Sequence, residues 1–298
     1  MAESTPASQF LFGGDPMPSI NHSDERRFWK SLCNAFQSLL NDITSGKTPA
    51  TNVDPRTRQF IQSPQFGGYL RRLIFRMTST IRKQSARSWR DAAARSGNGP
   101  EIARLIREEM KGPVGTIVWN LIEENATYIK TLPDEWARYA SRYAYRKTLQ
   151  GARPEEVEAE LRQIMPGHIT KNLKTIARTE CAKANAAIVQ ARAEMCGIKA
   201  YIWRCVNDER SRDSHAAMDG ILVFYDDPPN PEALFPSKGQ KPYGSYHAGN
   251  TFNCRCYQEP VVDISFLPDI IRVHDHGSIV TMTRAQIQKR YGQIAQAR

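Results

Sequence analysis

Cysteine and histidine side chains gather in one stretch of the chain, between residues 203 and 260. Cys254 and Cys256 are separated by a single residue, which places both thiols on one face of a β-strand. Structural zinc sites take four cysteine or histidine ligands, often from two short segments. The sequence therefore offers a candidate metal site of His215, Cys254 and Cys256, with Cys205 or His247 as the further ligand. The alternative is that the cysteines are small core residues and His215 bonds a backbone carbonyl.

Charged and amide side chains surround these cysteines in the sequence. They make up a candidate structural polar cluster of Asp208, Arg210, Arg212, His215, Asn253, Cys254, Arg255 and Cys256. Arginine–carboxylate pairs have a fixed fork geometry and commonly hold loops in place. An anion or phosphate site is the alternative. Residues 201–250 carry a net charge of −2, which favours the structural interpretation.

The same residues would also permit hydrolytic chemistry. His215 would act as a general base and Asp208 would hold a metal, as in a nuclease. A cysteine nucleophile would need a histidine beside it in space, which a sequence does not show. The chain contains no GxSxG, P-loop or HExxH motif. We therefore expect no catalytic residue and no enzyme, with a DNA-binding or metal-dependent DNA-processing protein as the alternative.

A second candidate surface is strongly basic. The chain carries 41 basic and 31 acidic residues, for a net charge of +10, and residues 51–100 alone carry +8. Such a patch suits nucleic acid or an acidic protein surface, and a solvated helix face is the alternative. The candidate contact residues are Arg71, Arg72, Arg76, Arg82, Lys83, Arg87 and Arg90.

Helical periodicity dominates the first two thirds of the chain. Apolar residues recur at steps of three or four in segments that we expect to be helices: 24–40, 70–95, 101–110, 114–130, 133–151, 154–164 and 169–196. Pro133 fits the first turn of a helix, and Gly151 and Gly197 fit helix ends. On the last of these helices, we expect Ile176, Cys181 and Ile188 to be buried, and Lys174 and Lys183 to be exposed.

Short strands replace helices after Gly197. Aromatic and β-branched residues predict strands at 201–206 and 221–225, and a third strand that begins at Asn253 and stops at Pro260. We expect the third strand to pack on the first, beneath a proline- and glycine-rich loop at 228–252. A hairpin around residues 275–277 and a helix from Thr283 follow. The fold class expected is α+β and predominantly α-helical.

Length and composition indicate a globular protein. The 298 residues allow one large domain or two ordinary ones, and 40% are hydrophobic while 24% are charged. No apolar run approaches the roughly 18–20 residues of a membrane span, and the start lacks the pattern of a secretory signal. Six cysteines are too few for a disulfide scaffold, so we expect synthesis in a reducing cytosol.

Several short strings follow one another in a characteristic order. They are residues 176–180 (IARTE) on the long helix, Trp203, residues 208–215 (DERSRDSH), residues 218–220 (MDG), residues 249–256 (GNTFNCRC) and residues 259–260 (EP). In this order the chain resembles the phage head morphogenesis domain, the Mu F-like minor head proteins of tailed bacteriophages. The resemblance covers about residues 115–262.

Composition and the resemblance together divide the chain into four regions. They are a mobile arm at 1–23, a basic helical region at 24–112, a Mu F-like domain at 113–262 and a hairpin and helix tail at 263–298. The Mu F-like domain consists of helices at 113–197 and a small β-containing module at 198–262.

The resemblance also implies a structural role in the virion. It implies a minor head (capsid) protein, made in the bacterial host cytoplasm, located at the portal vertex and needed for head morphogenesis and DNA-packaging competence. The partners implied are the portal protein, with the major capsid protein and packaged DNA as further candidates. No membrane and no small-molecule substrate is expected.

Some relatives carry cysteines where this chain has Arg212 and His215, and a histidine where it has Thr251. That set looks like a zinc site. Because ligands of that set are missing here, we expect a hydrogen-bonded network and no cofactor, with zinc as the alternative.

Overall fold

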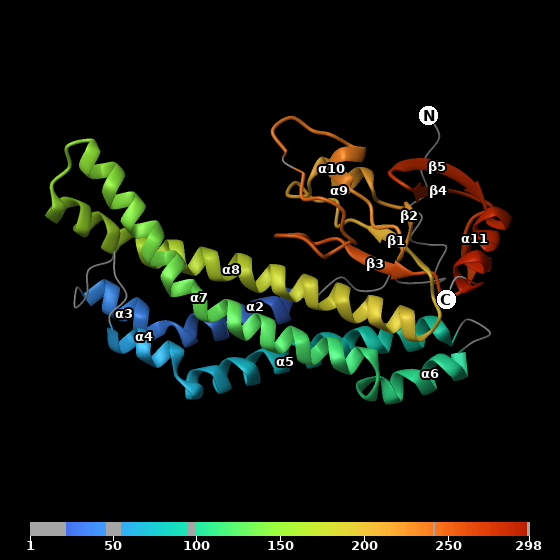
Figure 1. Ribbon diagram of the computed structural model, residues 1–298, viewed down its shortest axis with the longest axis horizontal. Helices are drawn as coiled ribbons and strands as arrows, with labels where there is room; N and C mark the ends of the chain where they lie inside the picture. The colour runs from blue at the N-terminus through green and yellow to red at the C-terminus, as the bar shows by residue number, and fades with distance from the viewer. Residues whose placement is uncertain (1–21, 46–54, 95–98, 241, 297–298) are drawn as a thin grey trace. The chain divides into compact units, whose positions relative to one another are not determined.

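The computed structural model describes residues 22–45, 55–94, 99–240 and 242–296 (Figure 1). The chain divides into two compact units. Unit 1 contains residues 79–118 and 181–298, and unit 2 contains residues 22–78 and 119–180. The arm expected at 1–23 lies outside the described residues except for His22 and Ser23, which open the first described helix.

Helices make up most of the described chain, with one small sheet, which confirms the expected α+β, mostly α fold class. The α-helices are α2 (His22–Ala35), α3 (Gln37–Ser45), α4 (Pro55–Gln62), α5 (Pro64–Ala93), α6 (Gly99–Glu108), α7 (Pro113–Leu149), α8 (Pro154–Met195), α9 (Asp213–Ala217), α10 (Pro231–Leu234) and α11 (Arg284–Gln296). The strands are β1 (Ala200–Arg204), β2 (Leu222–Phe224), β3 (Tyr257–Pro260), β4 (Ile270–Asp275) and β5 (Ser278–Thr283).

Helices α7 and α8 continue through prolines at which the sequence predicts a helix start or a break. Pro133 lies inside α7 and Pro166 inside α8. A proline inside a helix removes one backbone hydrogen bond and costs about 3 kcal/mol. The apolar stripe of α8 is buried on both sides of its proline, at Leu161, Met165, Ile169 and Leu173. Because burying each such side chain contributes about 1.5–3 kcal/mol, an unbroken helix is the more stable arrangement.

Aromatic side chains join the helices of unit 2. Phe36, at the junction of α2 and α3, meets Phe66 and Trp136 edge-on, with ring centroids 5.8 and 5.1 Å away. The indole nitrogen of Trp136 donates to Asn172 Oδ1 at 3.0 Å. Edge-to-face pairs of this kind stabilise beyond their buried area, so α5, α7 and α8 are tied to the N-terminal helices within this unit.

Unit 1 contains a five-stranded sheet with the order β3-β1-β2-β4-β5 (Figure 1). β1 pairs antiparallel with β2 and β3, β2 pairs parallel with β4, and β4 and β5 form the expected hairpin. The third strand begins at Tyr257, not at Asn253, and it includes Pro260, which an edge strand tolerates because it need not donate on its outer side. The sheet also extends past residue 262 to Thr283, so the tail hairpin belongs to it. We call residues 198–296 the sheet module.

The two faces of the sheet have different neighbours within unit 1. Ile202, Leu222 and Phe224 pack on a core that includes residues of α5, α6 and the end of α8. Tyr201, Trp203 and Val223 face the other way, into a second core that includes Cys254 and Cys256. The alternation of β1 and β2 therefore separates a helix-packing face from a face that carries the candidate site.

The burial expected for α8 is observed for its apolar residues. Ile176, Cys181 and Ile188 are at most 4% exposed, and Lys174 is exposed. Lys183 is half-buried instead of exposed, because it lines a hollow with residues of the loop before β3.

A buried ion pair lies among the helices of unit 1. Arg192 and Glu109 are 0% and 1% exposed, and Arg192 Nε donates to Glu109 Oε2 at 2.9 Å. Arg82, one of the candidate contact residues, bonds the other oxygen of Glu109 at 2.7 Å. Arg192 also donates to Ser85 Oγ at 2.6 Å. The carboxylate thus bridges two guanidinium groups, and Arg82 has a structural bond inside the unit.

Removing the charge of Glu109 should therefore destabilise unit 1. Glu109→Gln leaves the guanidinium of Arg192 buried without a counter-ion, and we expect a loss of about 3 kcal/mol in the free energy of unfolding. Glu108→Gln, at the exposed neighbouring position, is the matched control. Urea unfolding of both variants measures the difference, and equal losses would contradict a stabilising role for the ion pair.

Candidate functional site

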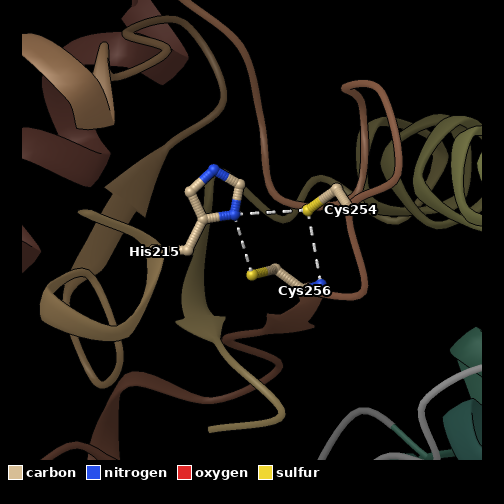
Figure 2. A group of neighbouring side chains, drawn as sticks. All are labelled: His215, Cys254 and Cys256. Carbon is tan, nitrogen blue, oxygen red and sulfur yellow. Dashed lines mark hydrogen bonds between the residues drawn. The ribbon is translucent and has the colours of Figure 1, made fainter. Parts of the chain in front are cut away.

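His215 is buried at the centre of the candidate site and contacts other groups through both ring nitrogens. It lies on α9, the short helix between β1 and β2. Its Nδ1 is 3.5 Å from Cys254 Sγ and 3.4 Å from Cys256 Sγ (Figure 2). Its Nε2 is 2.8 Å from the hydroxyl of Tyr246. The structure thus brings together the three side chains that the sequence analysis places in every version of the metal site.

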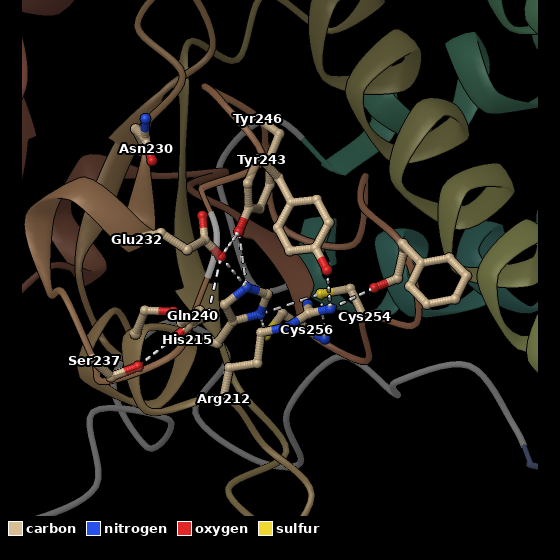
Figure 3. A network of polar contacts seen from close by, with 12 residues as sticks. Arg212, His215, Asn230, Glu232, Ser237, Gln240, Tyr243, Tyr246, Cys254 and Cys256 are labelled. Carbon is tan, nitrogen blue, oxygen red and sulfur yellow. Dashed lines mark hydrogen bonds and ion pairs between the residues drawn. The ribbon is translucent and has the colours of Figure 1, made fainter.

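A buried carboxylate determines which nitrogen of His215 carries hydrogen. The Tyr246 hydroxyl donates to Glu232 Oε1 at 2.6 Å (Figure 3). Since the hydroxyl hydrogen is used in that bond, its oxygen accepts from Nε2–H of His215. The lone pair of Nδ1 then faces the two thiols. Gln240 donates to the same carboxylate oxygen at 3.4 Å and to Ser214 Oγ at 2.9 Å.

The sequence predicts that Cys254 and Cys256 lie on a strand. They reach His215 from a loop instead. Asn253 has φ of +53°, and this left-handed residue turns the chain just before the two cysteines. The amide of Cys256 donates to Cys254 Sγ at 3.4 Å. Strand β3 begins only at Tyr257, because the preceding residues turn inward to bury both thiols.

Cys205 lies beside this cluster at the end of β1. Its thiol shares a hydrogen bond with Cys256, which lowers the pKa of Cys205 to about 6 against the opposing effect of burial. A hydrogen bond from Cys256, with help from His215, also holds the pKa of Cys254 well below its ordinary value. A polar hollow of about 60 Å³ is lined by Cys205, His215, Cys254 and Cys256, together with Arg210, Arg212 and Arg255. The site therefore favours the thiolates of Cys205 and Cys254, whereas its hydrogen bonds to these two raise the pKa of Cys256.

His247 does not join the cluster. Its Nδ1 is 3.2 Å from the Tyr201 hydroxyl, and its ring meets the rings of Tyr201 and Tyr225 edge-on. Burial lowers the pKa of His247 to about 4. Of the two candidates for the further ligand, Cys205 lies next to the cluster and His247 is engaged elsewhere.

The remaining polar residues of the predicted cluster form its rim. Arg255 makes a two-pronged ion pair with Asp208, and this holds the pKa of the Asp208 carboxyl well below its usual range. Arg212 donates to the Phe252 carbonyl at 2.9 Å and lies over the Tyr243 ring, 4.9 Å from its centroid (Figure 3). These bonds hold the loop before β3 against the segment that follows β1.

Sequence reasoning missed the polar groups on the far side of His215. Glu232, Tyr246 and Gln240 come from the loop after β2, and nothing in their spacing pairs them with a histidine seventeen or more residues earlier. The one available signal was composition, because a single glutamate lies in a proline-rich loop, directly after an Asn-Pro helix start.

Two kinds of chemistry match a thiol, an imidazole and a carboxylate in this order. One is a cysteine nucleophile activated by His215 and oriented by Glu232. The other is a metal site in which the carboxylate orients the ligating histidine. Cys254 and Cys256 are 2% and 6% exposed and share one nitrogen, whereas a nucleophile must reach substrate. The donor atoms of His215, Cys254 and Cys256 lie within 4.8 Å of one another, and this set of soft donors fits zinc.

The burial of His247 predicts a specific dependence of stability on pH. The unfolded chain takes up a proton on this residue near pH 6.5 and the folded chain only near pH 4, so stability is lost as the pH falls through this window. We expect His247→Gln to reduce that loss by up to about 3 kcal/mol. Urea unfolding at several pH values tests this, with His22→Gln, at a side chain 71% exposed, as the control. An unchanged profile for His247→Gln would contradict the assignment.

Comparison with known proteins matches this part of the chain to one family. Residues 143–259 match the model of the phage Mu protein F like protein family. A protein of Haemophilus influenzae, described as uncharacterized, is 34% identical over 174 residues, which are 58% of this chain and 33% of that protein. The chain thus spans about a third of the length of that relative. No solved structure gave a significant match.

The matched residues run from the end of α7 through α8 and the first three strands, and they include His215, Cys254 and Cys256. They carry the strings on which the resemblance in the sequence rests. This part of the chain, residues 143–259, is therefore similar to the phage Mu protein F like family.

Proposed function

We propose that this chain is a minor head protein of a tailed bacteriophage that acts in head morphogenesis at the portal vertex. The observation that carries the proposal is the family match, which covers α8 and the site around His215 together. The buried thiols and the paired arginines are better suited to holding a loop in place than to processing a substrate. Among the described residues, no helix is both long and apolar enough to span a membrane.

The basic surface of α5 supports contact with a partner of opposite charge. Arg71, Arg72 and Arg76 in unit 2 are exposed, and so are Lys83, Arg87 and Arg90 in unit 1. Arg71 bonds Glu123 of α7 at 2.7 Å, and Arg82 is half-buried on Glu109, so these two offer less to a partner. A partner would therefore have to compete with Glu123 for Arg71 and with Glu109 for Arg82.

Exposed aromatic rings lie among the arginines of unit 2. Phe75 of α5 and Trp119 of α7 are 42% and 56% exposed and stack with centroids 5.9 Å apart. Arg72 and Arg76 lie one turn before and directly after Phe75 on the same helix. Tryptophan and arginine are among the side chains most enriched at the centres of protein interfaces, whereas affinity for a DNA phosphate backbone comes largely from lysine and arginine. We therefore favour an acidic surface of the portal protein as the partner, ahead of the major capsid protein and packaged DNA.

Phage particles provide the direct test of this function. Mass spectrometry of purified particles should detect the chain in few copies, and deletion of its gene should yield heads that lack packaged DNA. Absence of the chain from particles would contradict the proposal. Metal-dependent DNA cleavage by the purified protein would favour the alternative of a DNA-processing enzyme with its site around His215.

Substitutions on unit 2 test the proposed contact. Trp119→Ala and Arg72→Gln should each weaken binding to purified portal protein about tenfold or more, because central aromatic and arginine side chains carry much of an interface's free energy. Tyr145→Ala, at an exposed aromatic residue near the end of α7, is the matched control.

DNA binding would give a different signature. If the partner were DNA, affinity would fall steeply with salt, and replacing Lys83, Arg87 and Arg90 with glutamine would flatten that dependence while Trp119→Ala had little effect. That pattern would contradict the portal contact.

A further inference from the structure

We propose that Cys205 completes a four-donor zinc site with His215, Cys254 and Cys256. The site would link the end of β1, helix α9 and the loop before β3. This inference rests on the donor geometry and not on the proposed role in the phage head.

The spacing of the observed donors matches a tetrahedral zinc site. Bond lengths of about 2.3 Å to sulfur and 2.0–2.1 Å to nitrogen place a sulfur and a nitrogen ligand about 3.6 Å apart. His215 Nδ1 lies 3.5 Å from one thiol and 3.4 Å from the other. The three side chains are therefore already at ligand spacing.

The hydrogen bonds of His215 leave the required nitrogen available. Tyr246 and Glu232 fix the hydrogen on Nε2, so the lone pair of Nδ1 faces the thiols. Zinc-bound histidines nearly always donate their other N–H to a carboxylate, a backbone carbonyl or a water, and here the Tyr246 hydroxyl accepts that bond and donates to Glu232. The second oxygen of Glu232 is buried and has no hydrogen-bond partner in the part of the chain that the structure describes. A full negative charge held in this position would raise the basicity of the ligating imidazole.

Cys205 lies beside the three donors but outside the group whose donor atoms are within 4.8 Å of one another, so its side chain must move toward them to fill the fourth position. Its side chain contacts Cys256 and lines the same hollow as the other three donors. Its amide donates to Asp219 Oδ1 at 2.8 Å, which fixes the backbone at the end of β1. His247, the alternative, is held by Tyr201 and does not line the hollow.

The surrounding charges suit a site of three thiolates and one imidazole. Such a set around Zn²⁺ carries a net charge of −1, which is costly to bury without compensation. Arg210, Arg212 and Arg255 all line the hollow. Arg255 is already paired with Asp208, so the guanidinium groups of Arg210 and Arg212 would offset the excess negative charge.

Cobalt substitution in the full chain counts the thiolate ligands directly. Titration of the metal-free protein with Co²⁺ should give the absorption of a tetrahedral site with three thiolates, and Zn²⁺ should displace it. Cys205→Ser should lose about one third of the thiolate-to-cobalt absorption and bind Zn²⁺ at least about tenfold more weakly. Cys196→Ser, which removes a half-buried thiol of the same unit outside the hollow, should leave the spectrum unchanged.

Two further variants test the proposal if Cys205→Ser folds poorly. Glu232→Gln should retain the three-thiolate spectrum and weaken Zn²⁺ binding by about 10–100-fold, and His247→Gln should change neither. A spectrum unaltered by Cys205→Ser, or lost with His247→Gln in a protein whose circular dichroism is unchanged, would overturn the ligand assignment. Failure of the wild-type chain to bind Co²⁺ or Zn²⁺ would overturn the site itself, without bearing on the presence of the protein in phage heads.

Discussion

The imidazole of His215 is the point on which the arrangement of the sheet module depends. Its two nitrogens bond groups from two different loops, the Tyr246–Glu232 pair on one side and the two cysteines on the other. More than thirty residues lie between β2 and β3, and those that the structure describes form one helical turn, α10. A connection of this length is uncommon in a compact domain unless side chains hold it down. His215, on the short helix α9, holds this connection in place through its contacts with Tyr246 and Cys254.

Burial makes this arrangement cooperative. Each polar group of the chain from Glu232 to the thiols is almost fully buried, and each depends on the next for a hydrogen bond. In a low-dielectric interior such bonds strengthen one another, but a missing partner leaves a costly unpaired group. The same interdependence supports either a metal-free network or a zinc site, because both need the same tautomer of His215. The module can therefore keep one loop conformation on a sheet whose edge strand, β3, has only four residues.

Much of this architecture follows from the sequence, and the failures have physical causes. Periodicity located the long helices, since burial dictates which faces are apolar, but it merged α2 with α3 and missed α4. The residues at 275–277 indicated the hairpin. Pro133 misled the prediction because proline is read as a local signal, whereas a buried apolar stripe, such as the one that continues through Pro166 in α8, outweighs one lost hydrogen bond. The spacing of Cys254 and Cys256 indicated a strand, but the left-handed Asn253 turns the chain before them, and a backbone reversal of this kind has no signature in spacing. Glu232 and Tyr246 were missed because their partner is distant in sequence and is found only through the pairing of β1 with β2.

Hydrogen–deuterium exchange of the full chain is the most direct test that His215 holds the loop between β2 and β3. The amide of Tyr246 bonds the Pro229 carbonyl at 2.9 Å, and that of Cys254 bonds the Thr251 carbonyl at 3.3 Å, so both report on the loop's order. If the account is right, His215→Ala will speed exchange of these amides by orders of magnitude while those of α6, elsewhere in the same unit, stay protected. Unchanged protection across residues 226–256 would contradict the account, because the loop would then be held by something other than the histidine.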